Sequence, residues 1–220
     1  VGKDALYSNT TASNNVAVGH ASLLYNSTGT NNVGVGKNTL NANTTAHNNT
    51  AIGACALKVN TTGSNNQAFG RAAMNANTTG GYNTAVGTQS LYNNTTGCWN
   101  TGVGFDTLCA TTTGGCNTAT GYRALHSNTT GYRNNATGYH SLYANTTGAH
   151  NTAVGYYTLA AATTGTFNTA VGNSALQQTT TGIKNAAIGN YALYSNTTGS
   201  YNTASGHYAL GLNTTGNSNT

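Results

Sequence analysis

The chain has 220 residues, of which 4% are charged and none is proline, and seven lysines and arginines against two acidic residues give a formal net charge of +5. The basic residues occur singly, which excludes the clustered positive patch typical of a nucleic-acid-binding protein. No apolar run approaches the roughly 18 residues of a membrane span, and no charged-then-apolar leader opens the sequence. An ordered chain of this composition must be held together mainly by hydrogen bonds.

One glycine recurs every 17 residues without a slip in register (19 − 2 = 17), from Gly2 and Gly19 to Gly206. The consensus reads N-T-A-V-G-x-x-(A/S/T)-L-x-x-N-T-T-G-x-x. A strict short period is the signature of a solenoid, in which each repeat packs on its neighbours. The sequence therefore predicts an all-β fold, a parallel β-solenoid (β-roll) of about 13 coils of 17 residues. We expect a single uninterrupted array over residues 1–220 that is a segment of a longer chain.

Each coil begins with a segment that alternates like a β-strand. In Asn151–Gly155 the side chains of Asn151, Ala153 and Gly155 should point to one side, and those of Thr152 and Val154 to the other. The small residue and the leucine after the glycine predict a second segment that ends at the N-T-T-G turn. Glycines at fixed corners fit positions that need a positive φ or that leave no room for a Cβ atom.

The asparagine four residues before each glycine, as in Asn15, Asn32 and Asn49, forms a regular column. Stacked side-chain amides can donate to one neighbour and accept from the other. We interpret this column as an asparagine ladder or a brace for the turn.

The β-branched residue before each glycine, as in Val18, Ile52 and Val86, faces away from the alanine beside it. Both faces of the strand therefore carry apolar side chains, as is typical of a strand buried on both sides. A strand that is buried on both faces needs a second partner. We therefore expect the alanines and leucines to form the interior of one chain, and the valines and isoleucines to pack on other copies in a fibre. Phe69, Thr120, Thr137 and Ser205 interrupt this column.

The motif N-T-A-V-G-x-x-x-L resembles the head repeats of trimeric autotransporter adhesins and related repeats of phage tail fibre proteins. The resemblance covers essentially the whole chain, although the period of 17 residues is longer than is typical of that family. It implies a left-handed parallel β-roll, three chains side by side, and a surface fibre used for attachment. Fold and function are separate questions, and the resemblance bears more on the fold.

Residues suited to catalysis or metal binding are sparse. The only carboxylates, Asp4 and Asp106, lie 102 residues or six coils apart (102 / 17 = 6), which excludes paired-carboxylate hydrolysis. The six histidines occupy different phases of the repeat and show no metal-ligand spacing. We expect no enzymatic activity, no catalytic residues, no cofactor and no metal.

Two modifications are conceivable. Cys98 and Cys116 are one coil plus one residue apart, which would allow a disulfide, and the alternative is that they are small thiols with no framework role. The N-T-T and N-S-T triplets are formal glycosylation acceptors, and the alternative is that they are turn residues whose side chains bond to the local backbone. Their asparagines are Asn9, Asn26, Asn43, Asn60, Asn77, Asn94, Asn128, Asn145, Asn196 and Asn213.

Aromatic residues follow the glycine in four consecutive coils. Phe105, Tyr122, Tyr139 and Tyr156 should therefore stack into a surface aromatic stripe. Such a stripe can bind a sugar or a protein, but it more often stiffens the coils as a stacking ladder.

These features together predict a structural or adhesive extracellular fibre or filament shaft on a cell or virion surface. Its expected partners are other copies of the chain, in a trimer or a head-to-tail filament, and a surface glycan or receptor, without nucleic acid or a membrane span. The alternative is an ice-binding β-solenoid, because Thr11, Thr28 and Thr45 begin a threonine column beside a second threonine. Adjacent threonines should point to opposite faces, however, whereas a flat array needs them two residues apart.

Overall fold

A computed structural model describes all of residues 1–220, which divide into two compact units, Val1–Thr113 (unit 1) and Gly114–Thr220 (unit 2). The chain is an all-β parallel β-solenoid of 17-residue coils, as predicted, and it has no helix. That the two units continue as one uninterrupted array stays a prediction.

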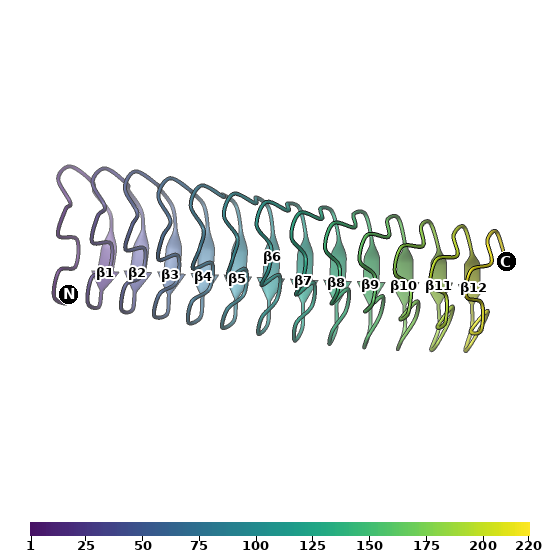
Figure 1. Cartoon of the computed structure of the whole chain (residues 1–220). Helices are drawn as coiled ribbons and strands as arrows, with labels where there is room; N and C mark the ends of the chain where they lie inside the picture. The colour runs from purple at the N-terminus through teal and green to yellow at the C-terminus, as the bar shows by residue number, and fades with distance from the viewer. The chain divides into compact units, whose positions relative to one another are not determined.

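Twelve three-residue strands, six in each unit, form the regular part of the fold (Figure 1). Unit 1 contains β1 (Val16–Val18), β2 (Val33–Val35), β3 (Thr50–Ile52), β4 (Gln67–Phe69), β5 (Thr84–Val86) and β6 (Thr101–Val103). Unit 2 contains β7 (Thr118–Thr120), β8 (Asn135–Thr137), β9 (Thr152–Val154), β10 (Thr169–Val171), β11 (Ala186–Ile188) and β12 (Thr203–Ser205). Within each unit, strands that follow one another pair in parallel, and partner residues such as Ala51 and Ala68 are one coil apart.

The central residue of each strand points into the coil and its two neighbours point out. Ala51 and Ala153 are fully buried, whereas Ile52 is 42% and Val154 is 36% exposed. The leucine column, as in Leu57, is also fully buried. The interior is therefore the narrow alanine and leucine core that the alternation predicts.

The second segment is a series of turns rather than a strand. Residues two and four positions after each glycine are in the left-handed region, as in Cys55 (φ 62°) and Leu57 (φ 48°). Their backbone N–H groups donate in opposite directions, from Cys55 to Lys37 O (2.9 Å) and from Leu57 to Ala73 O (3.0 Å). The coils on either side thus satisfy the backbone of a segment that has no regular strand.

The glycine of the repeat is required both by its backbone conformation and by the space around it. Gly53 has a φ of 130°, and a Cβ atom there would lie 2.5 Å from the carbonyl oxygen of Gly70 in the next coil. Only glycine permits this conformation and this close approach. The glycine column thereby fixes the spacing and register of the coils.

The asparagine column before each strand forms the predicted ladder and also braces the turn. The backbone N–H of Asn66 donates to Asn49 Oδ1 (2.9 Å), and Asn66 Nδ2 donates to the carbonyl oxygen of Gly80 (2.9 Å). The same pattern recurs in unit 2, where the Asn168 N–H donates to Asn151 Oδ1 (3.0 Å). Each of these side chains is buried and joins its own coil to a neighbouring one.

The asparagine of the N-T-T-G turn forms a second ladder. Asn60 Nδ2 donates to Asn43 Oδ1 (3.0 Å) and to the carbonyl oxygen of Gly63 (2.9 Å). In the next coil Asn77 Nδ2 donates to Asn60 Oδ1 (2.7 Å). These side chains are fully buried, so two amide ladders run through the coils.

The second ladder is interrupted where another residue replaces asparagine. Thr111 follows Asn94 by one coil, and Ala162 follows Asn145. Asn94 Oδ1 and Asn145 Oδ1 are buried without a hydrogen-bond partner. These two oxygens lack partners because the next coil carries no asparagine to donate to them. In the coils where asparagine is present, the ladder satisfies the equivalent oxygen.

Candidate functional site

Three tyrosines of the predicted aromatic stripe stack in unit 2. The ring centroids of Tyr122 and Tyr139 are 5.1 Å apart, and those of Tyr139 and Tyr156 are 5.2 Å apart, with interplanar angles of 11° and 18°. Because these rings cover one another's faces, they offer mainly edges and hydroxyl groups to a ligand. Phe105, the fourth residue of the stripe, belongs to unit 1.

Further rings join this stack into an aromatic cluster, which consists of Tyr122, His126, Tyr139, His140, Tyr143, Tyr156 and Tyr157. His140 lies at its centre, with its ring centroid 4.3 Å from that of Tyr139 and 4.5 Å from that of Tyr143. Tyr157 meets the His140 ring edge-on at 5.1 Å. The repeat pattern did not predict these contacts because the rings come from different phases of the repeat.

The aromatic cluster favours uncharged side chains. Burial lowers the pKa of His140, and the positive charges of Arg123 and His126 lower it further. The Nε2 atom of His140 is buried without a hydrogen-bond partner. Burial also raises the pKa of the Tyr157 hydroxyl, and the neighbouring hydroxyls of Tyr139 and Tyr156 add to this shift. Both shifts favour the neutral forms of these side chains, which suit the packed rings of the aromatic cluster.

The threonines of the N-T-T-G turn have different surroundings. Thr61 Oγ1 donates to Thr78 O (3.0 Å), and Thr78 Oγ1 donates to Thr95 O (3.0 Å). The second threonine of each pair, as in Thr62 and Thr79, is exposed. The turn thus presents one exposed file of threonines, whereas a flat ice-binding array needs two.

The ten asparagines of the formal glycosylation triplets belong to the second ladder. A glycan would be attached to Nδ2, but in Asn60 this atom is buried and donates to two acceptors. Asn9 and Asn213 are half-buried, and their Nδ2 atoms donate to the carbonyl oxygens of Ala12 and Gly216. The folded coils therefore favour the turn interpretation over glycosylation.

The two cysteines of the predicted disulfide are thiols in different units. Cys98 Sγ accepts from the N–H of Gly81 (3.3 Å) and donates to the carbonyl oxygen of Thr96 (3.4 Å), and Cys116 is exposed. A bond between Cys98 and Cys116 stays a prediction.

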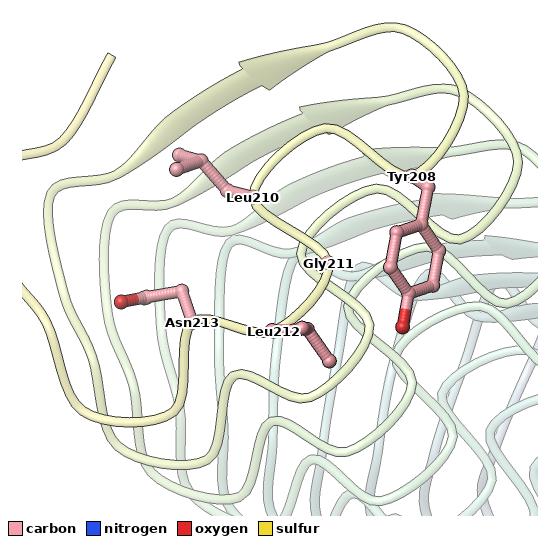
Figure 2. A pocket seen from close by; sticks show the side chains of 5 residues that line it. All are labelled: Tyr208, Leu210, Gly211, Leu212 and Asn213. Atoms are coloured by element: carbon pink, nitrogen blue, oxygen red, sulfur yellow. The ribbon is translucent and has the colours of Figure 1, made fainter.

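The structure shows no group of three or more histidine, cysteine, aspartate or glutamate side chains that could hold a metal ion. A shallow pocket in the last coil is lined by Tyr208, Leu210, Gly211, Leu212 and Asn213 (Figure 2). Its lining contains no carboxylate, histidine or thiol that could act as a nucleophile or general base. Nor does the fold contain a helix with the length and apolar character needed to cross a membrane.

The chemistry that unit 1 and unit 2 offer is therefore that of surfaces, namely the outer faces of the strands, the aromatic cluster and the exposed turns. Comparison with known proteins finds no matching family model, no matching curated protein and no matching solved structure.

Proposed function

We propose that this chain is a segment of a structural or adhesive extracellular fibre, in which copies of the chain pack side by side. The observation that carries the proposal is an apolar column on the outer strand face of unit 1, here called the valine column. It consists of Val18, Val35, Ile52, Phe69, Val86 and Val103, one residue from each of β1–β6. Val18 is 43% and Ile52 is 42% exposed.

The valine column is suited to a protein partner. Parallel pairing sets these side chains one coil apart, with Ile52 opposite Phe69 and Phe69 opposite Val86. Contiguous apolar patches on soluble proteins mark interaction surfaces, whereas scattered apolar residues do not. A second copy of the chain offers a column with the same spacing, so the two could pack rung against rung.

The interior of each unit supports a structural role. The core is filled by alanine and leucine side chains, and the two asparagine ladders hold successive coils together. Stacked repeats of this kind gain stability from each neighbour, so they provide stiffness and length rather than a catalytic cavity. The resemblance to adhesin and tail fibre repeats supports three chains side by side on a cell or virion surface.

Sedimentation equilibrium of the purified chain tests the proposal. We expect a stable oligomer, and we expect the double variant Ile52→Asp/Val86→Asp to sediment as a monomer because it would bury carboxylates in the interface. The matched control is Thr62→Asp/Thr96→Asp, which adds the same charges to the exposed threonine file. An oligomer that survives the first pair of substitutions, or a wild-type monomer, would contradict the proposal.

The ice-binding alternative has less support, since the N-T-T-G turns present only one exposed file of threonines. A thermal hysteresis assay separates it from the fibre proposal. Electron microscopy of the same material should show uniform fibres if the fibre proposal holds.

A further inference from the structure

A second column of exposed side chains lies at the corner of each coil, five residues before the repeat glycine. In unit 2 it runs from Cys116 to Ser218, and its five middle residues are here called the corner stripe: Arg133, His150, Phe167, Lys184 and Tyr201. Phe167 is 53% and Tyr201 is 52% exposed. Each residue donates its backbone N–H to the preceding coil, as Phe167 does to Ala149 O (3.1 Å) and Lys184 to Thr166 O (3.0 Å). The side chains are thus set one coil apart along one edge of the unit.

The corner stripe combines rings with two cations that lie beside rings. The guanidinium of Arg133 lies 5.9 Å from the ring centroid of Tyr132, which meets His150 edge-on at 5.3 Å. His150 stacks on Phe167 at 4.7 Å. Further along, Lys184 Nζ lies 5.0 Å from the Tyr201 ring centroid and 3.4 Å from its hydroxyl oxygen.

The backbone of this corner does not favour these residues. Every corner residue is left-handed, with φ values of 59° at His150 and Phe167 and 61° at Tyr201. Asparagine tolerates this conformation, and bulky residues do so at a cost. The first four coils carry asparagine at the same position, namely Asn14, Asn31, Asn48 and Asn65.

The leucines of the repeat, such as Leu57, also have a left-handed backbone conformation, but their buried side chains compensate for its cost. The corner side chains are largely exposed, so packing compensates them less. Non-glycine residues kept in an unfavourable conformation are a reason to look for a function. Rings and cations in place of asparagine therefore indicate a binding surface.

The charge of this surface selects an anionic ligand. Residues 114–220 contain no aspartate or glutamate, so no side-chain carboxylate in unit 2 competes for Arg133 and Lys184. His150 and Phe167 cover each other's faces, and the edges that remain carry the positive end of the ring quadrupole. Exposed threonines three residues before each corner residue, such as Thr164 and Thr181, add hydroxyl groups beside the corner stripe.

The spacing of the cations favours a polymer that is less densely charged than a nucleic acid. Arg133 and Lys184 are three coils apart (184 − 133 = 51 = 3 × 17), which is about 14 Å at the spacing of parallel strands. A nucleic acid strand would place about four phosphates in that span, at one per ~3.4 Å. Two fixed cations match a hydroxyl-rich chain with at most one charge per sugar unit better than such a charge density.

We propose that the corner stripe of unit 2 binds a linear anionic polysaccharide that lies along the stacked coils. Arg133 and Lys184 pair with its carboxylate or sulfate groups, and the edges of the His150 and Phe167 rings contact the sugars between them. The Tyr201 hydroxyl contacts the polysaccharide one coil beyond Lys184. The choice of a polysaccharide rests on the proposed extracellular function, whereas the anionic character of the ligand rests on the corner stripe alone.

Replacement of corner-stripe residues by asparagine, which the first four coils carry at this position, tests the proposal. The variant R133N/F167N/K184N/Y201N gives these four coils the asparagine of Asn48 and Asn65. The matched control is Y82N/W99N, which changes the same column in unit 1, where its six residues (Asn14, Asn31, Asn48, Asn65, Tyr82 and Trp99) include no cation. Binding of alginate and of neutral dextran is measured by calorimetry at low and at high salt, and the thermal midpoint of each protein is recorded.

We expect the wild-type chain and the Y82N/W99N control to bind alginate but not dextran, with an affinity that falls as salt is added. The corner-stripe variant should bind alginate at least tenfold more weakly, with an unchanged or higher thermal midpoint. Equal binding by the variant, a lower midpoint, or binding of dextran as strong as that of alginate would overturn the proposal. So would tighter binding of a single-stranded oligonucleotide than of alginate.

Sedimentation of the same samples keeps this proposal apart from the proposed function. If the corner-stripe variant loses alginate binding while its oligomer stays intact, the result supports the corner stripe as the binding surface and leaves the proposed side-by-side packing untouched. A monomer that still binds alginate would contradict side-by-side packing and leave the corner stripe supported.

Discussion

Asparagine occupies three columns of the repeat, and the columns use two different properties of this residue. Asn66 accepts and donates in the predicted ladder, and Asn60 does so in the ladder of the N-T-T-G turn. Asn48 instead holds a left-handed corner, with a φ of 58°. The same residue type thus serves hydrogen bonding in two columns and backbone conformation in the third.

The sequence predicted the first of these roles and only part of the second. The column of Asn49 and Asn66 was recognisable as a ladder or a turn brace because it is unbroken and its asparagines begin no glycosylation triplet. Asn60 lies in a triplet that also matches a glycosylation acceptor, so the local motif competed with the periodic one. That ladder could have been found by noting that its asparagines recur at the same 17-residue period as the buried leucines.

Ala162→Asn should stabilise the chain by restoring the second ladder. The new Nδ2 atom would reach Asn145 Oδ1, which is buried without a partner, and the carbonyl oxygen of Gly165. One hydrogen bond that satisfies a buried acceptor contributes about 1 kcal/mol, and urea denaturation measures the gain. Ala161→Asn is the control, because position 161 lies outside the ladder column, and an equal gain from both would argue against the ladder.

Local turn chemistry accounts for the part of each coil that is not strand. The alternation of N-T-A-V-G predicted β9 and its equivalents correctly, since only the central alanine is buried. The segment after the glycine was expected to be a second strand-like segment but consists of left-handed turns. A leucine at φ 48°, as in Leu57, opposes the intrinsic preference of that residue, so no propensity rule could have placed it there.

Gly53→Ala should strongly destabilise unit 1. The substitution combines a positive φ with a Cβ atom 2.5 Å from Gly70 O, so the strand and the next coil must separate. Backbone strain alone costs about 1–3 kcal/mol, and the steric clash adds to it. Urea denaturation should show the loss of stability. The control is Ala54→Ser at the adjacent exposed position, which should leave the free energy of unfolding nearly unchanged. A small effect of Gly53→Ala would contradict the stacking geometry.

Over the whole molecule, ionisable groups contribute little to stability. The chain has two carboxylates among 220 residues, so acid can protonate few groups that the folded state needs charged. Histidines are more numerous, and burial lowers the pKa of His140. The pH dependence of stability near neutrality should therefore come largely from the aromatic cluster.

Stability should fall as pH is lowered through the histidine range. The pKa of His140 is below the value of 6.5 for an unburied histidine, so the unfolded state binds more protons. The contribution of the neutral ring is complete above that value and is lost as pH falls from it toward the lower pKa of the folded state. Thermal midpoints recorded from about pH 7.5 to about pH 5 should decrease.

His140→Gln supplies the control for this pH dependence. Gln89 occupies the same left-handed position in unit 1 with a φ of 58°, so the backbone accepts glutamine there. We expect the decrease in thermal midpoint to be smaller in this variant. An unchanged slope would assign the effect to other histidines.

The asparagine ladder of the N-T-T-G turn is directional. Asn77 Nδ2 donates to Asn60 Oδ1, and Asn60 Nδ2 donates to Asn43 Oδ1, so each side-chain amide of this ladder points a hydrogen toward lower residue numbers. The row of threonine hydroxyls in the same turn runs the opposite way, as from Thr61 Oγ1 to Thr78 O. Aligned amides add their dipoles, as peptide units do in a helix. The ladder of the N-T-T-G turn is therefore electrically polar, with a spare amide hydrogen at its end of low residue number and a spare amide oxygen, such as Asn94 Oδ1, at the other. Another copy of the chain could continue this ladder only by presenting the unlike end.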